Sequence, residues 1–127
     1  TGTYLIDHRE FGWQAFGGNV TRSGDWVNVE PRDSFRKRVY LAPVGLWLVL
    51  DAGTFERVSL NTRTNAVRIS LSPADSFTPR ARLRVQQPAR IESVGTYAPR
   101  AKLLNERDAF TIPLQRVTTS IELTPKR

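Results

Sequence analysis

Residues 35–71 carry the sequence FRKRVYLAPVGLWLVLDAGTFERVSLNTRTNAVRISL, which is the strongest indication of the fold class of the chain. In its second half, apolar residues alternate with polar ones on both sides of the loop NTRTN. A period of two places apolar side chains on one face of an extended strand and polar side chains on the other. Because the loop is short and Asn tolerates left-handed backbone angles, residues 55–71 are predicted to form a β-hairpin.

The apolar run at residues 44–50, VGLWLVL, indicates a strand that is apolar on both faces. Pro43 precedes the run and Asp51 and Gly53 follow it, and a segment this short between breakers suits a strand better than a helix. In a two-layer sandwich each sheet normally has one solvated face. The second face of this strand, which carries Trp47, is therefore expected to contact either another domain or a loop of the same domain.

Short alternating segments separated by turn residues recur along the rest of the chain. Residues 26–30 and 35–41 are predicted strands, the latter with Phe35 facing the core, and residues 21–25 are a predicted turn. About nine or ten short strands at regular spacing indicate an all-β fold, an antiparallel β-sandwich of the immunoglobulin-like or jelly-roll-like kind. The length of 127 residues suits a single domain that covers residues 1–127.

Composition limits the classes of protein that the chain can represent. It has no Cys, which excludes a disulfide framework and a Cys-ligated metal site. It has no run of about 20 apolar residues, so no membrane-spanning helix and no membrane partner are expected. It also has no Met and begins Thr1-Gly2-Thr3, so we expect a fragment of a longer polypeptide.

The formal net charge is +7, and Arg supplies most of the positive charge. A basic balance raises nucleic acid or an anionic polymer as a partner. The Arg residues are spread along the predicted strands and form no block. Their distribution favours solvated strand faces over a dedicated nucleic-acid surface.

No catalytic or cofactor-binding motif stands out, so the chain is predicted to be non-catalytic and to need no cofactor. The single His, His8, lies in the polar run Asp-His-Arg-Glu, which is typical of a turn and offers neither a triad nor a His-based metal site. Glycoside hydrolysis needs two carboxylates across one bond, and the twelve acidic residues form no distinctive pair. Four acidic residues lie near the ends of predicted strands, where their oxygen atoms are suitable ligands for calcium: Asp25, Glu30, Asp33 and Asp51. No loop has the ligand spacing of a calcium-binding loop, so calcium is only a weak alternative to the absence of a cofactor.

The aromatic residues are the remaining functional signal. Aromatic planes stack on sugar rings, and Arg can bind carboxylated or sulfated sugars. The candidates for carbohydrate binding or interdomain contact are Trp13, Trp26, Trp47, Tyr40, Arg36 and Arg38. Tyr97 and Arg84 are further candidates for contact with sugars. The alternative is that most of these rings pack in the core, as aromatic residues do in small domains.

Residues 40–53, YLAPVGLWLVLDAG, the hairpin that follows and RLRV at residues 82–85 resemble the C-terminal β-sandwich modules that follow catalytic domains in large bacterial carbohydrate-active, glycoside hydrolase-like proteins. The resemblance implies a non-catalytic accessory domain that packs on the catalytic domain of the same polypeptide. It implies a secreted or periplasmic location if the parent protein degrades polysaccharide. Two alternatives stay open: a carbohydrate-binding module that uses exposed aromatic residues, and a basic nucleic-acid-binding β-barrel with Arg and aromatic residues on one surface.

Overall fold

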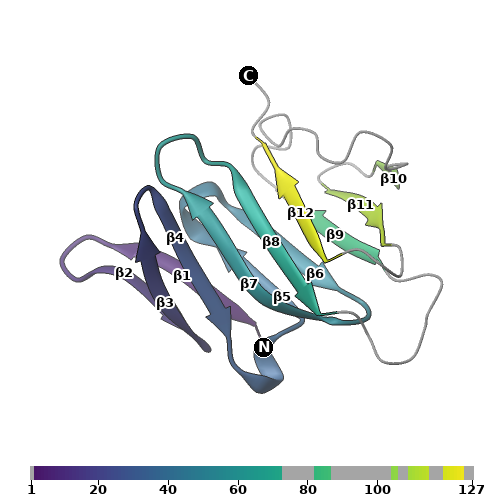
Figure 1. Cartoon of the computed structure of the whole chain (residues 1–127), viewed down its shortest axis with the longest axis horizontal. Coiled ribbons are helices and arrows are strands. Elements are labelled where there is room, and N and C mark those ends of the chain that lie inside the picture. Colours follow the sequence, from purple (N-terminus) through teal and green to yellow (C-terminus); the bar gives the residue numbers. More distant parts are fainter. Residues whose placement is uncertain (1, 73–81, 87–103, 106–108, 115–118, 125–127) are drawn as a thin grey trace.

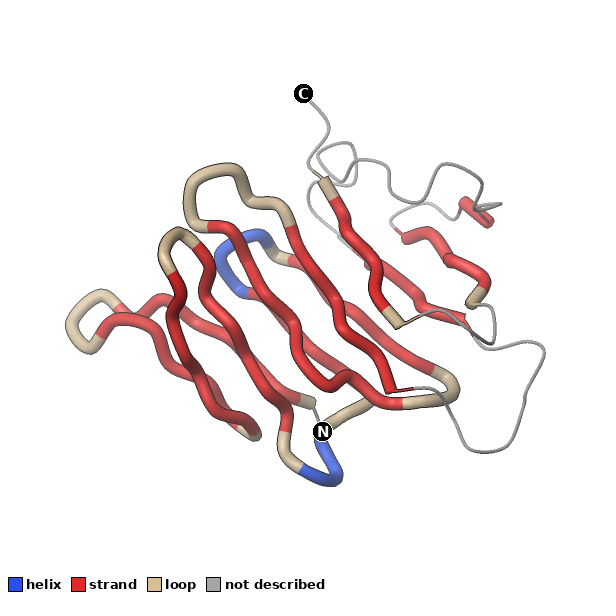
Figure 2. Tube along the Cα trace, in the orientation of Figure 1, coloured by secondary structure: helices blue, strands red, loops and turns tan. Residues whose placement is uncertain are grey.

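The computed structural model describes residues 2–72, 82–86, 104–105, 109–114 and 119–124. These residues form two β-sheets packed face to face, and Figure 1 shows the five-stranded sheet in front of the seven-stranded one. The helical structure in the described residues consists of two short 3-10 helices, η1 (Asp33–Phe35) and η2 (Ala42–Val44), drawn in blue in Figure 2. The predicted antiparallel β-sandwich is confirmed.

The seven-stranded sheet has the strand order β10-β11-β9-β6-β5-β1-β2. Its strands are β1 (Thr3–His8), β2 (Gly12–Phe16), β5 (Arg38–Leu41), β6 (Leu46–Leu50), β9 (Arg82–Gln86), β10 (Leu104–Asn105) and β11 (Ala109–Pro113). Its neighbouring strands are antiparallel except β1 and β5, which run parallel with Tyr4 opposite Tyr40. This parallel pair joins the β1–β2 hairpin to the central strands of the sheet.

The five-stranded sheet is antiparallel, with the strand order β12-β8-β7-β4-β3. Its strands are β3 (Gly18–Ser23), β4 (Trp26–Pro31), β7 (Thr54–Asn61), β8 (Val67–Ser72) and β12 (Ser120–Leu123). Each sheet ends in two edge strands, so the described strands form an open sandwich. The described strands therefore do not close into a barrel.

The hairpin predicted from the alternating pattern is formed by β7 and β8. The side-chain oxygen of Asn61 accepts the backbone N–H groups of Arg63 at 3.0 Å and of Thr64 at 2.9 Å, which closes the turn. Asn65 has φ 63°, the left-handed conformation that Asn tolerates. The predicted hairpin is confirmed. Its turn forms because Asn61 accepts hydrogen bonds from the loop backbone and Asn65 adopts the left-handed conformation.

The core lies between the sheets and consists of the inward-facing residues of both. The largest fully buried side chains are Phe55, Leu5, Leu41, Leu48, Leu60, Ile69, Leu83, Val27, Val29, Val39, Val58 and Val85. In β6 the alternation is complete: Leu46, Leu48 and Leu50 are buried, whereas Trp47 and Val49 between them are half-buried on the outer face. The two-faced character of this strand, predicted from its sequence, is confirmed.

Two predicted strands begin too early. The strand predicted over residues 35–41 begins at Arg38, and Phe35 lies half-buried in η1, because its N–H donates to the carbonyl of Arg32 at 2.8 Å and closes a turn. The strand predicted to begin at Val44 begins at Leu46 instead. Val44 belongs to η2, which ends at Gly45 in the left-handed conformation.

The predicted turn at residues 21–25 is too wide, since β3 continues to Ser23 and the turn is confined to Gly24 and Asp25. Arg22 pairs with Val27 in the register of β3 and β4. Because β3 is an edge strand, its polar side chains are next to solvent. Hydrogen bonding to β4 is therefore sufficient to hold residues 21–23 in the strand conformation, although their sequence is typical of a turn.

Candidate functional site

Four aromatic side chains lie in a row across the outer face of the seven-stranded sheet, and we call them the aromatic row: Phe16, Tyr4, Tyr40 and Trp47. They come from the adjacent strands β2, β1, β5 and β6. The strand register places Tyr4 opposite both Phe16 and Tyr40, and places Tyr40 opposite Trp47. Residues opposite each other on neighbouring strands point to the same face of a sheet, so these four side chains form one surface.

Three rings of the aromatic row pack on one another. The Tyr4 ring stands nearly perpendicular to those of Tyr40 and Trp47, with centroid distances of 6.2 Å and 5.5 Å. The rings of Tyr40 and Trp47 are tilted by 33° with centroids 4.7 Å apart. Edge-to-face contacts of this kind are favourable, by about 0.5–1.5 kcal/mol per pair beyond the burial of area. They also hold the rings in defined orientations.

The aromatic row is accessible from outside the sandwich. Phe16 is 59% exposed and Tyr4 is 38% exposed, and Tyr40 and Trp47 are half-buried. Their neighbours along the strands, Leu5 among them, are buried in the core. The row is therefore a separate apolar surface on the outside of the sheet.

Arginines lie beside the aromatic row: Arg38 is two positions before Tyr40 on β5, and Arg84 is on the neighbouring strand β9. Arg38 of β5 and Arg84 of β9 flank Val49 of β6 in the register. The guanidinium carbon of Arg38 lies 5.6 Å from the centroid of the Trp47 ring, within the range of a cation–π contact. Arg84 Nη1 donates to Gln86 Oε1 at 3.2 Å. The outer face thus combines rings and guanidinium groups.

The structure brings together three of the six candidate residues predicted from the sequence, Trp47, Tyr40 and Arg38. Trp13 faces the other side of the sheet and packs against the edge of the core. Arg36 lies after η1, beside the carboxylate of Asp33 at 3.8 Å, and is not part of the row. Neither Trp13 nor Arg36 lies with the other three candidates on the outer face of the seven-stranded sheet.

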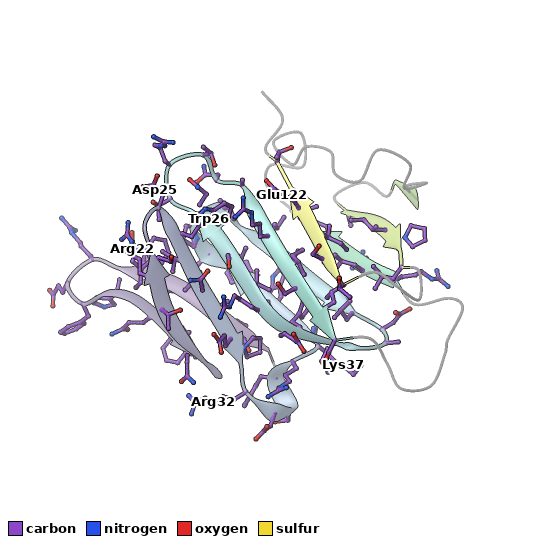
Figure 3. The ribbon with its side chains drawn as sticks, viewed as in Figure 1. Arg22, Asp25, Trp26, Arg32, Lys37 and Glu122 are labelled. Atoms are coloured by element: carbon purple, nitrogen blue, oxygen red, sulfur yellow. The ribbon has the colours of Figure 1, made fainter. Side chains whose placement is uncertain are left out.

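Trp26 lies on the outer face of the other sheet. The guanidinium carbon of Arg68 is 4.1 Å from its ring centroid, and the same guanidinium pairs with Glu122 at 3.4 Å. Figure 3 labels Trp26 and Glu122 on this sheet, which faces the viewer. Trp26 is thus covered by a paired cation and has no aromatic neighbour among the described residues. Tyr97, the further aromatic candidate, lies outside the described residues.

The outer face of the five-stranded sheet satisfies its polar groups internally. Asn28 and Ser59 are buried there, and the Ser59 hydroxyl donates to Asn28 Oδ1 at 2.5 Å. The Asn28 amide donates to the hydroxyl of Thr21 at 3.4 Å. Arg57 pairs with Glu30 at 2.9 Å. This face resembles an ordinary solvated sheet surface, in contrast to the aromatic row.

Ser59→Ala is expected to lower the free energy of unfolding by about 1–3 kcal/mol, because it leaves the buried Asn28 Oδ1 without its donor. Urea unfolding followed by circular dichroism measures the change. Ser70→Ala is the matched control, since Ser70 is half-buried on the same face and its side chain has no hydrogen bond to any described residue, and we expect a change within about 0.5 kcal/mol. Equal effects of the two substitutions would contradict the structural role of the hydrogen bond.

The acidic residues considered for calcium are dispersed over the described part of the chain. Asp25 lies beside Arg63 at 3.7 Å, and Asp51 accepts the backbone N–H of Arg82 at 2.7 Å. Glu30 and Asp33 have the arginine partners given above. In the described residues, no three His, Cys, Asp or Glu side chains form a group that could hold a metal ion.

His8 ends β1 and stabilises the turn to β2. Its Nδ1 accepts the backbone N–H groups of Glu10 at 3.0 Å and Phe11 at 3.1 Å, so the imidazole closes the turn in the polar run where the sequence predicted one. The Phe11 ring lies against the imidazole, with centroids 4.8 Å apart, and Phe11 is 70% exposed.

Within the described ranges, no helix has the length and apolar character needed to cross a membrane.

Sequence reasoning missed Tyr4 and Phe16 as members of the site. The alternation of Tyr4 and Ile6 with buried Thr3 and Leu5 is a local signal that Tyr4 points outward. Its position beside Tyr40 depends on the parallel pairing of β1 with β5, which joins residues 36 positions apart. A parallel pair of this kind leaves no periodic signal in the sequence.

The fold and this surface define an open two-layer β-sandwich domain with one aromatic, arginine-bearing sheet face. The chain belongs to the family DUF5695, a family of unknown function, and the match covers residues 1–121. No curated protein and no solved structure matches the chain. A function must therefore be argued from the aromatic row and its surroundings.

Proposed function

We propose that this chain is a non-catalytic accessory domain of a bacterial polysaccharide-active protein, and that it packs on the catalytic domain of the same polypeptide through the aromatic row. One observation carries the proposal. Four neighbouring strands place Phe16, Tyr4, Tyr40 and Trp47 on the outside of a sheet, where a sandwich normally has a polar, solvated surface. An exposed apolar patch of this kind is typical of an interaction site.

The composition of the face supports a protein partner. Tyr, Trp, Phe and Arg are the residues enriched in the centres of protein–protein interfaces, and Trp, Tyr and Arg supply most of the binding free energy there. The ring orientations support it as well. The Tyr4 ring stands at 89° and 86° to its two aromatic neighbours, so the row presents edges as well as faces. Side chains of a protein partner can interdigitate with such an uneven surface.

The isolated chain should then expose this patch and self-associate through it. We expect Phe16→Ser to raise the dissociation constant of self-association about tenfold, corresponding to about 1.4 kcal/mol, and to reduce the fluorescence of a bound hydrophobic dye. Sedimentation equilibrium measures the first quantity. Phe11→Ser is the matched control, because Phe11 is 70% exposed in the turn of the same hairpin but lies outside the row. A monomeric chain that binds no dye would overturn the proposal.

A carbohydrate-binding module is the second candidate, favoured by the exposure of Phe16 and Tyr4 on the same face as Arg38 and Arg84. The perpendicular rings argue against it, because a sugar stacks best on rings that lie flat against one surface. Affinity electrophoresis against neutral and acidic polysaccharides separates the candidates. Retardation by one glycan that Trp47→Ala abolishes and Trp26→Ala preserves would favour the binding module. Retardation by single-stranded DNA instead would favour the nucleic-acid alternative.

A further inference from the structure

We infer that the surface of the catalytic domain that packs on the aromatic row is acidic, and that one of its carboxylates pairs with Arg38. This inference rests on the function proposed above. The inference comes from the distribution of charge between the two outer faces of the sandwich. It specifies the chemistry of the catalytic-domain surface that would cover the aromatic row: an apolar centre with Asp or Glu at the side facing β5, β6 and β9.

On the described strands, the aromatic face carries charge of one sign. At the outward-facing positions of β1, β2, β5, β6 and β9, the charged residues are Arg38, Arg82 and Arg84, and none of these positions holds an Asp or Glu. Asp51 follows β6, and its carboxylate accepts the backbone N–H of Arg82. The full chain has a net charge of +7, which reinforces a positive potential around this face.

The polar face of the five-stranded sheet has the opposite organisation. Glu30 pairs with Arg57 at 2.9 Å, and Glu122 pairs with Arg68 at 3.4 Å. Arg38, by contrast, has no carboxylate within 4.0 Å among the described residues. Among the described residues its contact is with the Trp47 ring, which leaves the guanidinium N–H groups available to an external acceptor.

Docking determines what that acceptor must be. A domain that covers the aromatic row also removes water from Arg38, because its guanidinium lies 5.6 Å from the Trp47 ring. Burial of an unpaired cation is strongly unfavourable, whereas a carboxylate placed against a guanidinium makes short, charge-assisted hydrogen bonds. A neutral or basic partner surface would therefore oppose the same contact that the rings favour.

Two cross-linking reactions in the full-length polypeptide test the inference. In the first, p-benzoylphenylalanine in place of Phe16 captures on irradiation whatever lies on the aromatic row. In the second, Arg38→Lys introduces a primary amine, which a carbodiimide couples to a carboxylate in contact with it. Arg68→Lys is the control for this reaction, because Glu122 lies beside position 68. Peptide mass spectrometry locates each link, and unsubstituted protein accounts for links from native lysines.

We expect the photochemical link to reach a segment outside residues 1–127, and the carbodiimide link from position 38 to join an Asp or Glu in that segment. If the photochemical link forms but position 38 gives no link while Arg68→Lys couples to Glu122, the docking stands and the acidic partner is wrong. If the photochemical link reaches only a second copy of this chain, or nothing, the docking itself is wrong.

Discussion

Phe55→Ala is expected to lower the free energy of unfolding by about 3–5 kcal/mol, which is the usual cost of deleting a buried Phe side chain. Phe55 is fully buried and is the largest fully buried side chain in the described part of the chain. It lies in β7 of the five-stranded sheet, and its N–H donates to the carbonyl of Arg36 in the connection to β5 at 2.8 Å. The backbone is thus held at this point, so the core is poorly able to collapse into the cavity.

Chemical denaturation monitored by far-ultraviolet circular dichroism measures this change. Phe11→Ala removes the same side chain from a 70% exposed position, and we expect a change within about 0.5 kcal/mol. The comparison cancels the chemistry of the substitution and retains only the difference in burial. A loss below about 1 kcal/mol for Phe55→Ala would contradict the placement of this residue in the core.

Leu48→Ala is expected to cost about 2–5 kcal/mol, through lost burial and the cavity left behind. Leu48 is fully buried in β6, which lies between β5 and β9 in the interior of the seven-stranded sheet. Its paired neighbours Val39 and Val85 are also buried and are anchored in the ladder on either side. The surrounding strands therefore have little freedom to close the gap.

Val49→Ala is the matched control for Leu48→Ala. Val49 is the next residue along β6 and points to the outer face, where it is half-buried between Arg38 and Arg84. We expect it to cost less than about 1 kcal/mol, because partial exposure leaves less apolar area to lose. Thermal unfolding of both variants measures the difference. Equal losses would mean that the two faces of β6 are equally covered, which contradicts an open aromatic face.

Much of the secondary structure could be predicted from the sequence because its causes are local. The β7–β8 hairpin follows from a period of two and from Asn side chains that close the turn, as Asn61 and Asn65 do. Where local causes competed, prediction failed. Phe35 and Val44 continue apolar patterns that suit strands, yet both lie in 3-10 helices. Backbone hydrogen bonds between residues three positions apart bend the chain at both places, and the apolar pattern does not indicate them.

The candidate site could be predicted only in part. Trp47, Tyr40 and Arg38 are three of the candidates that the sequence predicts, and they lie together because β5 and β6 are consecutive antiparallel neighbours. Tyr4 and Phe16 join them through the parallel pairing of β1 with β5, and Trp13 and Trp26 leave the group because they lie on other faces. Residue types alone do not distinguish a Trp over the core from a Trp on the outside of a sheet.

The all-β class, the central two-faced strand and the hairpin beside it follow from the amino-acid sequence alone, because side-chain alternation and turn chemistry act between residues close in the chain. The order of the strands, by contrast, is seen only in the folded chain, where four aromatic residues from β2, β1, β5 and β6 form one surface beside Arg38. Strand order results from the packing of the whole core, in which distant segments compete for the same partners. A functional surface assembled across strands is therefore a property of the fold and not of any one segment.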